Sequence, residues 1–174
     1  DIVGINAPKK LFFQLIAISI IIKAGFLYNL TTNDFANIFI SFIFYILVIN
    51  SMNLIDGIDG LSSGIFILFS LSMLIIYMEL SMINPKYYIL LSIFMGSIAG
   101  FFIINFPPAK LFLGDAGSQL LGWVSAVSVV HISSQFEAVI FKIFFISFLS
   151  LPLYDVLFVA YRRFMNSKEK MIVS

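Results

Sequence analysis

The sequence contains no cysteine, few charged residues and a single histidine, and each shortage excludes a class of protein. Without cysteine there is no disulfide framework, no cysteine metal site and no thiolate nucleophile. Only 11% of the 174 residues are charged, and ten basic residues nearly balance nine acidic ones. A net charge of +1 gives no basic surface for nucleic acid, so we expect no nucleic-acid partner.

Apolar side chains, in contrast, make up 61% of the chain, whereas a soluble domain has about 45–50%. This composition indicates an integral membrane protein. A helix needs about 20 apolar residues to cross the hydrocarbon core, and it satisfies its own backbone hydrogen bonds there. Six segments have this length and composition: 11–30, 35–55, 61–79, 87–106, 117–133 and 138–161. The sequence therefore predicts an all-α, polytopic transmembrane helix bundle with about six spanning helices.

Consecutive spans place every loop on one of two sides of the membrane. Most basic residues fall on the side that holds the N-terminus: Lys9, Lys10, Lys110, Arg162, Arg163, Lys168 and Lys170. Because basic residues in short loops favour the cytoplasm, we expect this side to be cytoplasmic.

Four carboxylates are predicted on the same cytoplasmic side, at or near helix ends: Asp1, Asp56, Asp59 and Asp115. Carboxylates this close to hydrocarbon cost free energy and repel one another unless a cation neutralises them. An all-oxygen ligand set favours Mg²⁺, with Mn²⁺ as a second option, over a soft metal. The pattern predicts a divalent-cation site at this face.

Two polar segments carry the residue types that phosphate chemistry needs. Residues 50–64 contain Asn53 and two Asp-Gly pairs, and residues 105–118 place Asp115 between two glycines. Glycine permits tight turns, and the start of the following helix presents free N–H groups to an anion. Asp-Gly pairs also occur in ordinary loops, and Phe112 is either a packing residue or a platform for a nucleobase.

Three further residues have structural readings. His131 lies near the opposite end of the fifth predicted span, far from the carboxylates, and we expect it to be a packing residue. Gly96 and Gly100 are four residues apart, a spacing typical of close helix packing in membranes.

The two polar segments resemble the signatures of a known enzyme family. Residues Asn53–Leu61, with the sequence NLIDGIDGL, resemble the first signature of the polyprenyl-phosphate N-acetylhexosamine-1-phosphate transferases. Residues Phe112–Ser118 are similar to the second signature, with Leu113 where Met is usual. Asp1, followed by Lys9, Lys10 and Gln14, resembles the end of the family's Asp-Asp segment.

The resemblance implies a Mg²⁺-dependent transferase in the bacterial inner membrane, with several spans and its active site facing the cytoplasm. Such an enzyme transfers a sugar-1-phosphate from a UDP-N-acetylhexosamine to a polyprenyl (undecaprenyl) phosphate and releases UMP. The product initiates cell-wall or surface-polysaccharide synthesis, lipopolysaccharide included. Ile55 and Ile58 resemble the N-acetylglucosamine type more than the muramoyl-pentapeptide type.

The resemblance also implies a role for each site residue. The catalytic set is Asp1, Asp56, Asp59 and Asp115, and the substrate-binding set is Asn53, Asn105, Phe112, Lys9 and Lys10. In this assignment Asp115, together with Asn53, ligates Mg²⁺, and Asp1 binds or deprotonates the lipid phosphate. The two Asp-Gly carboxylates hold the nucleotide and order the site, Phe112 stacks on uracil, and one of the two lysines neutralises phosphate.

Other readings stay in view. A CDP-alcohol phosphotransferase would need an arginine soon after an Asp-Gly pair, but Leu61 follows Gly60 here. A transporter would place its charges at the midplane within an internal repeat, and no repeat is visible. An inactive homologue or a structural membrane fragment remains open, because the family has about ten or eleven spans. We therefore expect residues 1–174 to be a single transmembrane catalytic core, incomplete at both ends and inactive alone. Membrane lipid or a second copy in a homodimer are options for covering its apolar surface.

Overall fold

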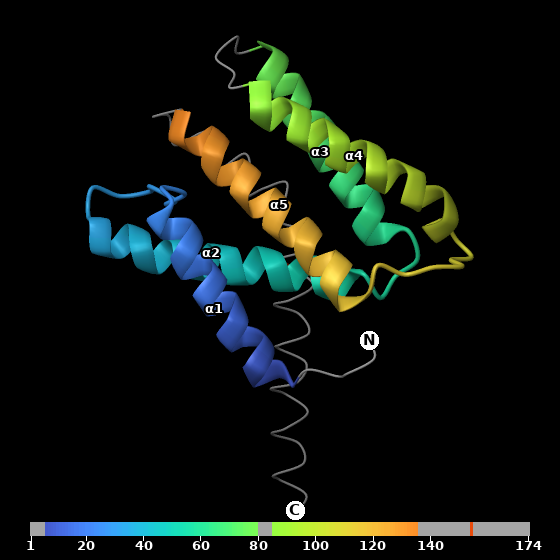
Figure 1. The fold of residues 1–174 in the computed structure, drawn as a ribbon, viewed down its shortest axis with the longest axis horizontal. Coiled ribbons are helices and arrows are strands. Elements are labelled where there is room, and N and C mark those ends of the chain that lie inside the picture. The colour runs from blue at the N-terminus through green and yellow to red at the C-terminus, as the bar shows by residue number, and fades with distance from the viewer. Residues whose placement is uncertain (1–5, 80–84, 136–153, 155–174) are drawn as a thin grey trace, which may run out of the picture.

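The protein is an all-helical bundle in the part of the chain that the structure describes. The computed structural model describes residues 6–79, 85–135 and 154 (Figure 1). Its helices, in chain order, are α1 (Ala7–Lys23), α2 (Asp34–Ile55), α3 (Leu61–Glu79), α4 (Pro85–Asn105) and α5 (Gly114–Gln135). These helices correspond to five of the six predicted segments, and the sixth, 138–161, lies outside the described residues apart from Tyr154.

Three described helices are long and apolar enough to cross a membrane: Asp34–Ile55, Leu61–Met78 and Pro85–Asn105. The prediction of an all-α membrane helix bundle is therefore confirmed. The described residues supply three candidate spans instead of about six, because α1, with 17 residues, is short and α5 is interrupted by polar side chains.

Local sequence explains where the helices begin. The Asn33 side chain caps α2 by accepting hydrogen bonds from the backbone N–H groups of Phe35 and Ala36, at 2.9 and 3.2 Å. Gly60 precedes α3 with a φ of 71°, and Gly114 begins α5 with a φ of 66°. Both angles lie in the left-handed region that favours glycine. Each polar segment therefore makes a sharp turn directly into a helix.

The first predicted span was wrong at its C-terminal end, because α1 ends at Lys23 and not near residue 30. Gly25, with a φ of 97°, turns the chain out of the helix. Beyond it Tyr28 is buried and stacks on Phe44 with 4.9 Å between ring centroids. Its backbone N–H donates to Ser41 Oγ at 2.9 Å. The apolar residues after α1 thus belong to a packed connection that covers α2.

Helices α2 and α5 lie side by side, and α3 pairs with α4 (Figure 1). Helix α5 comes close to α2 at Gly122, where an added Cβ would lie 2.6 Å from Ile49 Cα. The packing role predicted for Gly96 and Gly100 is wrong within the described residues. Both are exposed, and no described atom lies within 4 Å of a Cβ built at either position. The small residue that permits close helix packing is Gly122.

Helix direction alternates along the chain, which gathers the polar segments at one end of the bundle. The starts of α1, α3 and α5 and the ends of α2 and α4 lie at this end, called here the site end. His131 lies about 24 Å further along α5, where its ring stacks on Tyr87 with 3.7 Å between centroids. It occupies the opposite end of the bundle, as predicted for a packing residue.

Candidate active site

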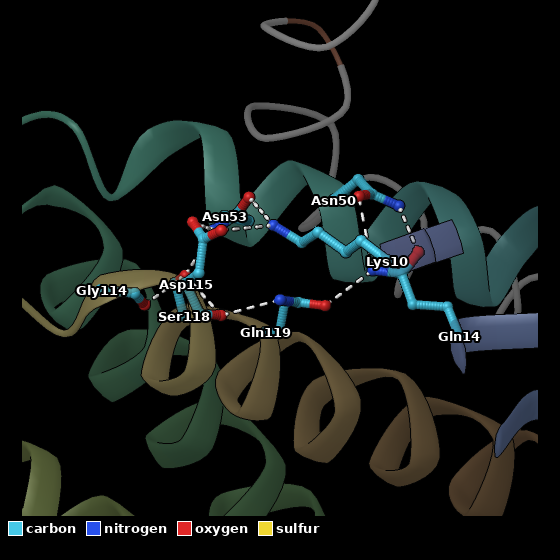
Figure 2. A network of polar contacts seen from close by, with 8 residues as sticks. All are labelled: Lys10, Gln14, Asn50, Asn53, Gly114, Asp115, Ser118 and Gln119. Atoms are coloured by element: carbon cyan, nitrogen blue, oxygen red, sulfur yellow. Dashed lines mark hydrogen bonds and ion pairs between the residues drawn. The ribbon is translucent and has the colours of Figure 1, made fainter. Parts of the chain in front are cut away.

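Three helices bring polar residues to a common point at the site end (Figure 2). Lys10 Nζ on α1 donates to Asn53 Oδ1 on α2 at 2.7 Å and to Asp115 Oδ2 on α5 at 3.1 Å. Asn53 Nδ2 donates to Asp115 Oδ1 at 2.9 Å and to Ser118 Oγ at 2.8 Å. These four residues, Lys10, Asn53, Asp115 and Ser118, are called the ionic layer. Three separate motifs of the sequence thus meet in one network.

Asp115 is the open member of the ionic layer. Its side chain is 55% exposed, whereas that of Lys10 is 18% exposed. The hydrogen bond from Asn53, followed by the hydrogen bond and the charge of Lys10, holds the pKa of Asp115 below its usual value. The carboxylate also lies in the first turn of α5, where the helix dipole favours negative charge. Asp115 is therefore an ionised, solvent-accessible carboxylate at neutral pH.

A second set of side chains lies one helical turn further into the bundle (Figure 2). Gln14 Nε2 donates to Gln119 Oε1 at 2.8 Å, and Asn50 Nδ2 donates to Gln14 Oε1 at 3.1 Å. Gln119 Nε2 donates to the backbone carbonyl of Asp115 at 2.9 Å. We call Gln14, Asn50 and Gln119 the amide layer. Sequence reasoning gave these residues no role, although each is three or four residues from a member of the ionic layer.

Asn105 joins the two polar segments. Its Oδ1 accepts from Gly60 N at 3.1 Å and from Ser63 Oγ at 2.7 Å, and its Nδ2 donates to the carbonyl of Leu111 at 2.8 Å. The side chain is 1% exposed. Asn105 therefore fixes the loop after α4 against the turn before α3, which is a structural use of a residue predicted to bind substrate.

The two Asp-Gly carboxylates are occupied by local hydrogen bonds. Asp56 is buried and its Oδ1 accepts from Ser62 Oγ at 2.6 Å, while Asp59 Oδ2 accepts from the backbone N–H of Ala109 at 2.9 Å. Both bonds order the loops around the site. Asp1, the fourth predicted carboxylate, lies outside the described residues.

Among the described residues, no group of three or more Asp, Glu, His or Cys side chains could hold a metal ion. The predicted gathering of several carboxylates is thus not seen in this part of the chain. What the ionic layer offers is one exposed carboxylate, Asp115, which accepts from the amide nitrogen of Asn53, while the Asn53 amide oxygen accepts from Lys10. Mg²⁺ is commonly held by one or two carboxylates together with substrate phosphates and water. This oxygen donor set fits Mg²⁺ better than a softer metal.

The other predicted binding residues are placed at the surface of the site end. Phe112 is 53% exposed in the loop that leads into α5. Lys9 is exposed, and it is Lys10 that reaches Asp115. A separate apolar cavity of about 440 Å³ lies among α1, α3, α4 and α5. Its lining includes Tyr77, Tyr87 and Trp123 and none of the predicted site residues.

Comparison with known proteins agrees with the motifs at this site. The model of the family described as glycosyl transferase family 4 matches residues 1–133. The chain belongs to this family. The match includes every residue of the ionic and amide layers. No solved structure matches the chain.

Curated proteins are also similar to the chain over much of its length. A probable undecaprenyl-phosphate N-acetylglucosaminyl 1-phosphate transferase of Bacillus subtilis (strain 168) is 35% identical over 70% of this chain and 33% of its own length. A phospho-N-acetylmuramoyl-pentapeptide-transferase of Streptococcus sanguinis (strain SK36) is 32% identical over 82% of the chain and 46% of its own length. One from Lactobacillus gasseri is 33% identical over 82% and 48%. The chain thus spans between a third and a half of the length of these relatives.

Proposed function

We propose that the complete protein carrying this sequence transfers a sugar-1-phosphate from a UDP-sugar to a polyprenyl phosphate and releases UMP. N-acetylglucosamine-1-phosphate is the sugar phosphate we assign, and the cytoplasmic face of the bacterial inner membrane is the place. The product would initiate cell-wall or surface-polysaccharide synthesis. The relatives named above support this reaction class. The Bacillus subtilis protein is named for N-acetylglucosaminyl 1-phosphate, whereas the other two are named for phospho-N-acetylmuramoyl-pentapeptide.

The meeting of Lys10, Asn53 and Asp115 carries the proposal. These residues come from three motifs that are far apart in sequence, yet they form one hydrogen-bonded network with a cation, an amide and an open carboxylate. Two phosphorylated substrates bring several negative charges together, so the transfer needs positive charge beside a polar, oriented site. A purely structural role would not require the carboxylate to stay 55% exposed.

In the proposed reaction an oxygen of the polyprenyl phosphate attacks the β-phosphorus of the UDP-sugar. The bond from that phosphorus to the bridging oxygen breaks, and the oxygen leaves with UMP. Negative charge grows on the phosphoryl oxygens, so catalysis consists mainly of positioning and charge stabilisation. Lys10 would neutralise a phosphate oxygen, Phe112 would stack on the uracil ring, and Asp1 would bind or deprotonate the lipid phosphate.

Asp115 and the amide oxygen of Asn53 would hold Mg²⁺, or Mn²⁺, in this proposal. The ion would neutralise charge on the diphosphate. Asp56 and Asp59 would order the loops through the hydrogen bonds described above and hold the nucleotide through their remaining oxygens. Asn105 would support this arrangement through its buried hydrogen bonds to Gly60 and Leu111.

The test is exchange of radiolabelled UMP into UDP-N-acetylglucosamine, with undecaprenyl phosphate and Mg²⁺, in membranes that carry the complete protein. We expect exchange in the wild type and a loss of at least about 100-fold in Asp115→Asn, the scale seen when a group that stabilises transition-state charge is removed. The matched control is Asp34→Asn. It makes the same chemical change in the first turn of α2, at the end of that helix far from Asn53.

A panel of UDP-sugars separates a wrong sugar from a wrong reaction. Exchange with UDP-N-acetylmuramoyl-pentapeptide alone would replace the assigned sugar and keep the reaction. A folded complete protein that exchanges no label with any donor, in Mg²⁺ or Mn²⁺, would favour an inactive homologue and overturn the proposal.

A further inference from the structure

We infer that Gln14 is a positioning residue: through the amide layer it holds α1 in the rotation that delivers Lys10 to Asn53 and Asp115. The inference concerns the geometry of the ionic layer, and its importance for turnover rests on the function proposed above. Within the described residues Gln14 hydrogen-bonds to Asn50 and Gln119 and not to Lys10 or the Asp115 carboxylate, so it acts through the helices it joins.

The two layers are built from the same three helices at the same register. Lys10 and Gln14 are four residues apart on α1, Asn53 and Asn50 three apart on α2, and Asp115 and Gln119 four apart on α5. Residues at these spacings share one face of a helix. Each helix therefore contributes to both layers with side chains about one turn apart, and α5 adds Ser118 to the ionic layer.

The direction of the amide hydrogen bonds is fixed at both ends by backbone carbonyls. Gln119 Nε2 donates to the Asp115 carbonyl, so its Oε1 faces Gln14 and accepts from it. Asn50 Nδ2 donates to the Ile46 carbonyl at 2.8 Å and also to Gln14 Oε1. Because backbone carbonyls only accept hydrogen bonds, rotating any of these side-chain amides by about 180° would lose a hydrogen bond. Gln14 therefore donates from its nitrogen to Gln119 on α5 at 2.8 Å and, over a longer 3.5 Å, to Asn50 Oδ1 on α2, while its oxygen accepts from Asn50 Nδ2.

Burial shows how much α1 depends on this residue. Of the 17 residues of α1, only Gln14 and Ile18 are buried, and Gln14 is 5% exposed. Near Lys10 the helix has little apolar packing to set its rotation, because Ile21 and Ile22, which pack against the apolar core, lie at its other end. A buried amide that bonds two neighbouring helices has one satisfactory orientation, since unpaired buried polar groups are costly. The hydrogen bonds of Gln14 therefore set the rotation of α1 about its axis, and this rotation sets the position of Lys10.

The experiment measures the position of Lys10 without using turnover. The complete protein in lipid nanodiscs is treated briefly with acetic anhydride, and mass spectrometry gives the acetylation of Lys10 relative to Lys9. In the wild type Lys9 should react faster, because Lys10 is largely covered and bonded. Gln14→Met keeps the side-chain length and removes the hydrogen bonds. We expect it to raise the Lys10-to-Lys9 ratio about tenfold, the scale of one charge-assisted hydrogen bond.

The matched control is Ser19→Ala, because within the described residues Ser19 Oγ bonds its own helix at the Leu15 carbonyl, 2.8 Å away. This control should leave the ratio unchanged. Should Gln14→Met fail to fold, Gln119→Met removes the bond between α1 and α5 from the other partner and should also raise the ratio. UMP exchange is measured on the same samples.

The outcomes separate this inference from the proposed function. A raised ratio with reduced exchange in Gln14→Met supports both. A raised ratio in a protein whose wild type exchanges no label supports the positioning role and overturns the proposed reaction. A folded Gln14→Met or Gln119→Met protein with the wild-type ratio overturns the positioning role, whatever the exchange activity.

Discussion

Replacing Gly122 with alanine tests whether the close approach of α2 and α5 sets the geometry of the ionic layer. The new Cβ would lie 2.6 Å from Ile49 Cα and 3.2 Å from the carbonyl oxygens of Val48 and Ile49, whereas ordinary contacts begin at 3.4 Å. These neighbours are backbone atoms, so no side-chain rotation relieves the clash. The helices must separate by about 0.8 Å, and overpacking of this kind costs about 1–3 kcal/mol.

The same separation acts on the site, because Ser118 lies one turn from Gly122 on α5. Asn53 Nδ2 on α2 bonds Ser118 Oγ at 2.8 Å and Asp115 Oδ1 at 2.9 Å. An increase of about 0.8 Å takes both distances beyond the range of a hydrogen bond. We therefore expect Gly122→Ala to lose UMP exchange as well as stability, although residue 122 itself contacts no polar member of the site.

The assay compares thermal unfolding and UMP exchange of the complete protein in detergent, with Gly100→Ala as the control. Gly100 has no described atom within 4 Å of a built Cβ, so alanine there should be neutral or should gain up to about 1 kcal/mol of helix propensity. Gly122→Ala should melt several degrees lower than Gly100→Ala. Equal melting temperatures for the two variants would refute the claim that this contact sets the helix spacing.

Three further predictions concern single residues of the site end. Asn105→Ala removes the buried amide that joins the two polar segments, leaves its partners unpaired, and should lower the free energy of unfolding by about 1–3 kcal/mol in chemical denaturation. Phe112→Ala should raise KM for the UDP-sugar about 5-fold or more, because one stacking contact is lost. The control is Phe106→Ala in the same loop, where the side chain is similarly exposed and KM should not rise. Equal KM values for the two variants would contradict the stacking role. The lowered pKa of Asp115 means that its hydrogen bonds with Asn53 and Lys10 stabilise the fold above the usual carboxyl pKa, and that this stabilisation is lost as pH falls through the lowered value. The difference in melting temperature between wild type and Asp115→Asn should therefore be full at neutral pH and shrink below about pH 4; a difference that is independent of pH would refute this origin.

Much of the site could be predicted from sequence because hydropathy fixes the direction and depth of each helix. Once the spans alternate, the start of α1, the end of α2 and the start of α5 must share one end, and Lys10, Asn53 and Asp115 with them. Hydropathy carries less information about lateral packing. Hydropathy could not show that, among the described residues, Gly122 would meet another helix and Gly96 and Gly100 would not.

The errors have similar physical causes. The apolar run after Lys23 reads as membrane-spanning, but its hydrophobicity serves burial of Tyr28 against α2. The hydrogen bonds of Asp56 and Asp59 to Ser62 and to the Ala109 backbone form only when the loops fold, so the sequence does not identify these partners. The sequence does carry a signal for Gln14, since a polar residue four positions from Lys10 in an apolar helix indicates a buried hydrogen-bond partner.

Because Lys10 and Asp115 are each other's counter-ions, binding of opposite charges at the site end is thermodynamically linked. An anion that takes Lys10 leaves a carboxylate uncompensated beside the hydrocarbon boundary, and a cation that takes Asp115 leaves an ammonium uncompensated. When both arrive, each charge regains a partner. Reciprocity then requires that the anion raise the affinity for the cation by the same factor as the cation raises the affinity for the anion. Until both are present, the pair keeps the charges of the ionic layer balanced.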